Sequence, residues 1–249
     1  MGLRIQHALL MAGAWVAAAA PARAWTEADV RAVRAEVDVA PDGGAHVQLE
    51  LGVKVRRGWL EGLEVAGLDP DLELDPERPP WWIPVDDGDA EREPPAFEPD
   101  VRVFRDGRVQ LRFIDRRSPR RGTYRAGFAY RTRLQVEPAA DDRLRLRWTL
   151  PPWRSGLDDV EVRVHAPGRA HPAKSLPDAP SGVRVTRQED ADGTTLTFRR
   201  THLPRTVAWP VAVEVPAGAM APGLVPEAPE RAAPPRAVSA APPGDPAPR

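Results

Sequence analysis

The stretch "VRAEVDVAPDGGAHVQLELGVKV", residues 33–55, decides the fold class. Apolar residues alternate with polar ones up to Val39, the dipeptide Asp42-Gly43 follows, and the alternation resumes from Val47 to Val55. A period of two places the apolar side chains on one face of a strand, and glycine accepts the positive φ angle that a tight reversal requires. The stretch therefore predicts a two-stranded antiparallel hairpin with one buried face.

The same pattern recurs along the chain. Alternating residues flank Asp106-Gly107 and Asp192-Gly193, and further alternating segments occupy residues 124–136, 143–150, 160–166 and 207–215. About nine or ten short strands, with few segments of helical period, are typical of an antiparallel sandwich or barrel. We therefore expect an all-β protein, an antiparallel β-sandwich over residues 25–215. A long loop near residues 86–100 divides it into two packed subdomains or lies within one.

Two local features modify this plan. Thr26 and Asp29 are spaced as an N-cap residue and its N3 acid, which predicts a short helix within residues 25–37. Pro210 interrupts the apolar pattern of residues 207–215, and proline cannot donate a hydrogen bond to a neighbouring strand. We therefore expect that strand to lie at a sheet edge or to contain a bulge.

The two ends of the chain differ from its middle. Residues 1–24 run from Arg4 through an apolar stretch to Ala22-Arg23-Ala24, the order of a secretory signal peptide with its cleavage site. No later segment is long and apolar enough to span a bilayer. Residues 216–249 are rich in proline and alanine, and such a segment buries too little apolar surface to offset its ordering entropy. We expect a cleaved signal peptide, a periplasmic or extracellular domain, and a disordered tail.

Composition excludes several classes of function. The chain has no cysteine, so disulfides, thiol catalysis, cysteine metal sites and lipid attachment through cysteine are excluded. Its formal net charge is −1, which gives no sign of a nucleic-acid binder. The sequence leaves the oligomeric state open.

The tryptophans are the first candidate site. Trp148 and Trp209 alternate in phase with apolar neighbours, so both should lie in the core. Trp81 and Trp82 are adjacent and would point to opposite faces of a strand, while Trp153 follows two prolines at a corner. Most of these rings should fill the interior, but Trp82 and Trp153 are the candidates for an exposed platform that binds sugar rings or a proline-rich peptide.

Two charged loops are further candidates. The segment "RRSPRRGTY", residues 116–124, brings together Arg116, Arg117, Arg120 and Arg121. Guanidinium groups there could grip phosphates of lipopolysaccharide or of a membrane surface, or the loop is simply solvated. The acidic loop offers calcium-type oxygen ligands, but its spacing matches no twelve-residue calcium loop; its acids are Asp86, Asp87, Asp89, Glu91 and Glu93.

Catalytic and metal-binding motifs are absent from the sequence. It contains no H-E-x-x-H, no G-x-S-x-G, no G-x-G-x-x-G and no Walker loop. His165 and His171 are separated by a Pro-Gly loop, which is a poor geometry for joint metal ligation. We therefore expect no cofactor and no catalytic residue. Paired carboxylates that meet in space would still make a glycoside hydrolase, and the sequence leaves that alternative open.

The order of "VDVAPDGGAHVQLEL", "FRDGRVQLRF", "RGTYRAGFAYRTRL" and "WTLPPW" resembles the extracytoplasmic β-domain of bacterial predicted membrane proteins of unknown function. The resemblance covers residues 33–215 and implies an envelope location, with no catalytic residue carried over. Those relatives continue into transmembrane helices, whereas this chain continues into a Pro/Ala-rich segment. The function that we expect is that of a non-enzymatic, exported module that binds an envelope protein or, as the alternative, a glycan.

Overall fold

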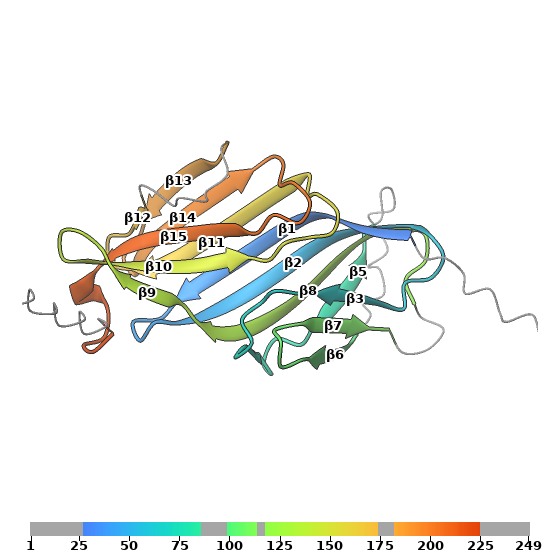
Figure 1. The fold of residues 1–249 in the computed structure, drawn as a ribbon, viewed down its shortest axis with the longest axis horizontal. Helices are drawn as coiled ribbons and strands as arrows, with labels where there is room; N and C mark the ends of the chain where they lie inside the picture. Colours follow the sequence, from blue (N-terminus) through green and yellow to red (C-terminus); the bar gives the residue numbers. More distant parts are fainter. Residues whose placement is uncertain (1–26, 86–98, 114–117, 174–181, 225–249) are drawn as a thin grey trace, which may run out of the picture.

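The computed structural model describes residues 27–85, 99–113, 118–173 and 182–224. Within these ranges the chain forms fifteen strands and one short 3₁₀ helix (Figure 1). The elements are β1 (Glu27–Val39), β2 (Gly44–Arg57), β3 (Gly62–Val65), β4 (Glu73–Leu74), β5 (Trp81–Pro84), β6 (Asp100–Val103), β7 (Val109–Arg112), β8 (Gly122–Arg133), β9 (Gln135–Pro138), β10 (Arg143–Leu150), β11 (Asp159–Pro167), β12 (His171–Pro172), β13 (Arg184–Glu189), β14 (Gly193–Arg200), β15 (Trp209–Pro216) and η1 (Ala217–Ala219).

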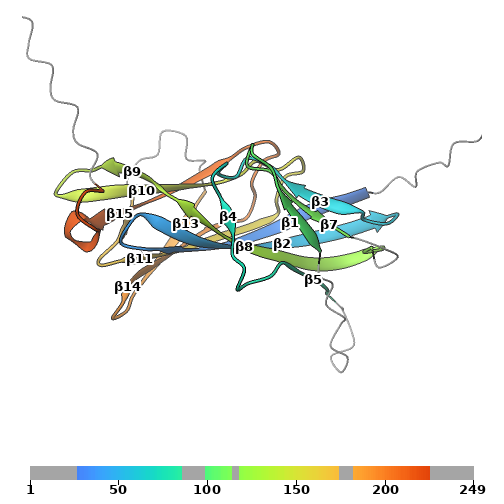
Figure 2. The same ribbon diagram turned by 90° about the horizontal axis from the view of Figure 1, so that it is seen from below.

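The strands form three sheets that pack in two layers. The large sheet has the order β13-β14-β11-β1-β2-β8-β4, with β5 also paired to β8. Two smaller sheets, β12-β15-β10-β9 and β3-β7-β6, lie side by side over one face of the large sheet (Figure 2). This arrangement confirms the predicted all-β class and the sandwich.

The predicted hairpins are all present. β1 pairs with β2 around the turn that contains Gly43, whose φ of 78° is the left-handed value expected there. β6 pairs with β7, and β13 pairs with β14. One pairing departs from the antiparallel plan, because β1 and β11 run parallel, with Ala32 opposite Asp159. Residue alternation cannot reveal this, since parallel and antiparallel strands share the same period of two.

Apolar side chains of all three sheets belong to one core. They come from the inward positions of the long strands, and the largest fully buried ones include Trp82, Trp209, Tyr130, Phe128 and Leu111. Trp148 is 8% exposed and Trp209 is 2% exposed, so both predicted core positions are confirmed. Pro210 faces Thr149 of β10, and the short β12 reaches only Val213 and Glu214, so the predicted edge position of Pro210 is also confirmed.

The predicted helix near the N-terminus is wrong. Residues 27–37 belong to β1, which pairs with β2 on one side and β11 on the other. The register shifts between Val30 and Ala32, and the extra residue places Val30 and Val33 on the same buried face. A buried spacing of three imitates a helix in sequence, whereas here it results from a bulge.

The folded part of the chain extends beyond the predicted boundary at residue 215. Met220 is 6% exposed in the core, and the Ala221 N–H donates to the Pro41 carbonyl at 2.7 Å. Leu224 packs against the core beside Gly43. Burial of these side chains therefore extends the fold to Leu224; the rest of the predicted tail, and most of the loop at 86–100, lie outside the described residues.

The described ranges contain no helix with the length and apolarity that a bilayer span requires.

Candidate functional site

Burial of the tryptophans agrees with the interpretation that most of these rings fill the interior, and it contradicts the alternative of an exposed platform at Trp82 and Trp153. Trp82 is fully buried, with its ring edge-on to Phe113 at a centroid distance of 4.7 Å and tilted against Tyr124 at 5.6 Å. Trp153 is only 7% exposed. The prediction that these two rings are exposed is therefore wrong, and a flat sugar-binding platform loses its two members.

The register between β5 and β8 explains the burial of Trp82. Trp82 faces Ala126 on the core side of β8, and Trp81 faces Gly127 on the outer side. A Cβ atom added to Gly127 would lie 2.6 Å from the Trp81 ring, so the missing side chain is what lets that ring lie on the sheet. Only one ring of the adjacent pair can enter the core, and the cross-strand register selects it.

The arginine loop is described only in part, because Arg116 and Arg117 lie outside the described residues. The Arg120 guanidinium lies 4.7 Å from the centroid of the Trp59 ring, and Arg121 is exposed. The Trp59 side chain is 49% exposed, and it is the one tryptophan among the exposed large apolar residues of the described ranges. The sequence analysis did not identify it as a candidate. The stacking is a cation–π contact that orients Arg120 along the ring.

The polar candidates of the sequence are described only in part. All five acids of the acidic loop lie outside the described residues. The Nδ1 atom of His165 contacts the Thr195 hydroxyl at 3.1 Å, whereas the Nδ1 atom of His171 accepts from Arg187 at 3.1 Å. In the part of the chain that the structure describes, no three His, Asp or Glu side chains are placed to hold one metal ion.

A groove between β1 and β3 is the candidate site that the fold itself creates. It has a volume of about 400 Å³ and is bounded by the first residues of β1, by β3 and by the corner after β10. Its lining residues are Ala28, Val30, Leu60, Glu61, Gly62, Leu63, Glu64, Trp153, Arg154 and Ser155. The walls combine apolar side chains with polar ones, and the charged lining residues are two glutamates and one arginine.

The first edge along this groove belongs to β1. β11 begins at Asp159, opposite Ala32, so residues 27–31 of β1 extend beyond the end of their parallel neighbour. Two contacts from the corner partly cover this edge: the Asp158 N–H donates to the Arg31 carbonyl at 2.7 Å, and the Ser155 hydroxyl donates to the Val30 carbonyl at 3.2 Å. Before Val30, β1 has no strand neighbour on this side within the described ranges.

The second edge belongs to β3, which pairs with β7 alone. The Phe113 N–H donates to the Glu61 carbonyl at 3.0 Å, so Glu61 and, at a period of two, Leu63 direct their backbone groups toward β7. Gly62 and Glu64 therefore direct theirs away from β7. β6 is the opposite edge strand of the same sheet. The Phe104 N–H donates to the Arg108 carbonyl in the β6–β7 hairpin, so the backbone groups of Val103 point away from β7.

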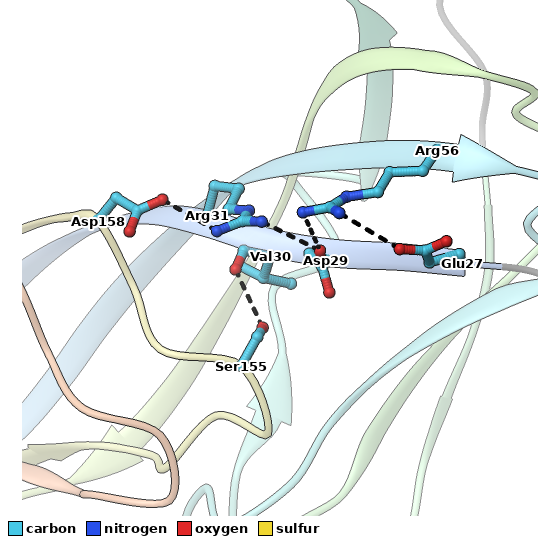
Figure 3. Close-up of polar contacts among 7 residues, drawn as sticks. All are labelled: Glu27, Asp29, Val30, Arg31, Arg56, Ser155 and Asp158. Carbon is cyan, nitrogen blue, oxygen red and sulfur yellow. Dashed lines mark hydrogen bonds and ion pairs between the residues drawn. The ribbon is translucent and has the colours of Figure 1, made fainter.

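A chain of ion pairs fixes the side chains on the β1 side of the groove (Figure 3). Arg31 bridges Asp158 and Asp29 at 3.2 and 3.3 Å, and Arg56 bridges Asp29 and Glu27 at 3.2 and 3.3 Å. Exposed pairs of this kind contribute little stability each. Their effect here is positional, because the chain of charges fixes five side chains along the strand beside the groove.

Trp153 contributes the one buried donor of the groove lining. Its indole N–H is buried and has no hydrogen-bond partner among the described residues. A buried N–H without an acceptor costs roughly 1–3 kcal/mol, so an acceptor that reached it would be bound favourably. The sequence gives no signal for this role, because the spacing of Trp153 says nothing about which strands end beside it.

Comparisons with known proteins inform the fold alone. No protein-family model matches the sequence, and no curated protein matches it. A mutant M1 zinc metallopeptidase from Deinococcus radiodurans, solved with a Tyr-Ser-Ala substrate, is similar with a TM-score of 0.50 and 17% identity over 75% of this chain and 42% of that chain. Another structure of an M1 zinc metallopeptidase from the same organism has a TM-score of 0.47 and 18% identity over the same shares. The chain thus spans less than half the length of these proteins, and the first of them, at 17% identity, supports a similar fold alone.

Proposed function

We propose that this chain is an exported, non-enzymatic β-sandwich module of the bacterial cell envelope, and that it binds an extended segment of another envelope protein in the groove. The observation that carries the proposal is that two open strand edges, the start of β1 and residues 62–64 of β3, line one groove together with several apolar side chains. Export and the envelope location rest on the signal-like pattern of residues 1–24.

The two edges favour a single extended strand as the occupant. An exposed strand edge presents unpaired backbone groups that can pair with another chain. A strand that belonged to a second copy's sheet would carry its own neighbour on one side, whereas a lone extended segment can use both of its sides. Addition of such a segment to a sheet edge is an established mode of peptide recognition.

The groove also restricts the chemistry of the segment. The open groups at Gly62 and Glu64 require N–H donors and carbonyl acceptors, so proline is excluded opposite them. Alternate side chains would meet Leu63 and Val30, which favours apolar residues at those positions. Glu64 already pairs with Arg108 at 3.4 Å, which leaves Glu61 against Arg154 in the lining, so the groove favours neither sign of charge in the segment.

Proline substitutions on the two edges of the same small sheet test the proposal. Glu64→Pro removes the outward N–H of β3, and Val103→Pro removes the outward N–H of β6; neither removes a bond to β7. We expect the wild-type chain and Val103→Pro to retain the same stoichiometric partner from envelope extracts, and Glu64→Pro to lose it. In the wild-type complex, hydrogen exchange should slow at the amides of Gly62 and Glu64 and not at Val103.

Retention of the partner by both proline variants, or no slowing of exchange at Glu64, would contradict strand addition. Recovery of the chain without any stoichiometric partner under several extraction conditions would contradict the binding function as a whole. Equal denaturation midpoints of the two variants would show that any difference in binding is not a difference in folding.

A further inference from the structure

A second opening lies where β8 leaves the large sheet and continues as β9. It has a volume of about 270 Å³ and is bounded by the turn Gly67–Pro70, the end of β8 and the end of β10. β9 pairs with β10 only from Leu144 to Arg147, so Trp148 and Thr149 lie beyond its end. We call this opening the cleft. It is slightly smaller than the roughly 300–1,000 Å³ of ordinary ligand pockets, so it suits a small molecule.

The inner wall of the cleft presents a protonated hydroxyl. Tyr130 is 1% exposed, and its hydroxyl is hydrogen-bonded to the Trp148 side chain, whose ring N–H can only donate. Burial, with a smaller contribution from the charge of Asp69, raises the pKa of Tyr130 far above its usual value of 10.0. The hydroxyl therefore keeps its own proton at all ordinary pH values and is a donor.

Asp69 is the acid that lines the cleft, and its carboxylate already accepts hydrogen bonds from this chain. The Thr132 hydroxyl donates to one oxygen of Asp69, and the Asp71 N–H donates to the other at 2.9 Å. Asp69 therefore fixes the turn against β8. Its oxygens are satisfied by groups of the protein.

The mouth of the cleft carries donors that the protein satisfies poorly. Arg133 and Gln135 are exposed there, and Arg147 follows on β10. The ion pair of Arg147 with Glu137 is long, at 3.8 Å, and the Arg147 Nε–H is buried without a partner among the described residues. The Nε–H of Arg145, on the same face of β10, is likewise buried without a partner among the described residues, but the Arg145 guanidinium makes a closer ion pair, with Glu214 at 2.9 Å.

We propose that the cleft binds a small carboxylate, with Arg147 gripping its oxygens and the Tyr130 hydroxyl donating from the inner wall. A planar carboxylate matches the fork of a guanidinium group and accepts two parallel hydrogen bonds. The excess of donors over free acceptors in the lining selects an anion over a cation or an amide. This site is separate from the groove and does not depend on its occupant.

Ligand-observed NMR titration of the full chain tests the site. The probes are acetate, succinate and benzoate, with acetamide, succinamide and benzamide as uncharged controls and inorganic phosphate as a second anion. We expect at least one carboxylate to bind with a Kd in the millimolar range or below, and its amide to bind at least tenfold more weakly. Arg147→Gln should weaken that carboxylate at least tenfold, whereas Arg145→Gln should leave its Kd unchanged.

Tyr130→Phe keeps the ring, removes the donor, and should also weaken binding, so it carries the test if Arg147→Gln fails to fold. The proposal is overturned if none of the three carboxylates binds at 20 mM, a concentration roughly matched to weak small-ligand affinities. Equal binding of an amide or tighter binding of phosphate overturns the assignment to a carboxylate. Equal loss in Arg145→Gln overturns the role of Arg147.

Discussion

The groove and the cleft have the same architectural origin but different side chains along their walls. Each lies where one strand is longer than its neighbour. β1 extends beyond the start of β11, and β10 extends beyond the end of β9. The groove is lined by two open strand edges, with apolar side chains such as Leu63 and charged ones such as Glu61 beside them. The cleft also has apolar residues such as Leu68 and Leu134, but it adds guanidinium, amide and hydroxyl donors around one satisfied acid.

The difference shows that an unpaired strand end allows binding but does not determine which ligand binds. The backbone edge is the same in both places, and the side chains beside it decide what can bind. Two open strand edges with apolar side chains beside them favour another polypeptide, because its backbone can pair with the edges while its side chains bury apolar surface. Donor-rich walls favour a compact anion that satisfies several donors at once.

The largest expected effect on stability compares a core residue that lines the cleft with an edge-strand residue that lines the groove. Tyr130 is 1% exposed and stacks near Phe128 at 5.9 Å, so Tyr130→Ala should cost roughly 3–5 kcal/mol in the free energy of unfolding. Leu63 in the groove is half-buried on an edge strand, and Leu63→Ala should cost about 1–2 kcal/mol. Urea denaturation measures both. Equal losses would mean that the groove wall is as much a part of the core as the cleft wall.

A smaller effect compares the hydroxyls that pin each opening. Thr132→Val removes the donor to the Asp69 carboxylate and should cost roughly 1–3 kcal/mol, because the hydrogen bond is to a charged group. Ser155→Ala removes the donor to the Val30 carbonyl and should cost about 0.5–1.5 kcal/mol, because both groups are neutral. Thermal or urea unfolding of the two variants under one buffer condition gives the order. The reverse order would show that the corner at Ser155 anchors the fold more than the turn at Asp69 does.

The smallest expected effect is a pH dependence of stability that comes from two carboxyl groups, Asp75 and Asp106. The turn after β4, a strand that pairs with β8 at Tyr130 of the cleft, is held by Asp75, whose pKa lies below the ordinary 3.8 because the Glu77 N–H donates to it, with His46 and Arg131 adding to the effect. In the hairpin that leads into the groove wall, the Arg108 side chain lowers the pKa of Asp106 in the same direction.

A carboxyl whose folded pKa is lowered stabilises the fold above its unfolded pKa, and that contribution is lost as pH falls through the folded value. The differences between wild type and Asp75→Asn, and between wild type and Asp106→Asn, should therefore both shrink below about pH 4. Asp75 is 5% exposed and Asp106 is exposed, so 0.5 M salt should reduce the Asp106 difference and leave the Asp75 difference largely intact. Denaturation curves from pH 2 to 7 at two salt concentrations check this. A salt-insensitive Asp106 difference would be inconsistent with a screened surface pair.

The candidate sites were harder to predict than the fold. A strand pattern states which residues share a face, and this was enough for the hairpins, for Trp148 and Trp209, and for the edge position of Pro210. It gives no information on which strand ends first beside another. Ser155, Leu63 and Tyr130 therefore carried no functional signal, and Trp82 was assigned to the wrong environment.

By itself, the sequence determined an all-β sandwich, because alternation of apolar and polar residues acts within each strand and needs no knowledge of its partners. Only the tertiary structure decided the parallel pairing of β1 with β11, the choice of Trp82 over Trp81 for the core, and the two openings. These depend on register and relative strand length between segments far apart in the chain. A period of two is unchanged by the direction of pairing and by any slip of two residues, so it cannot encode them.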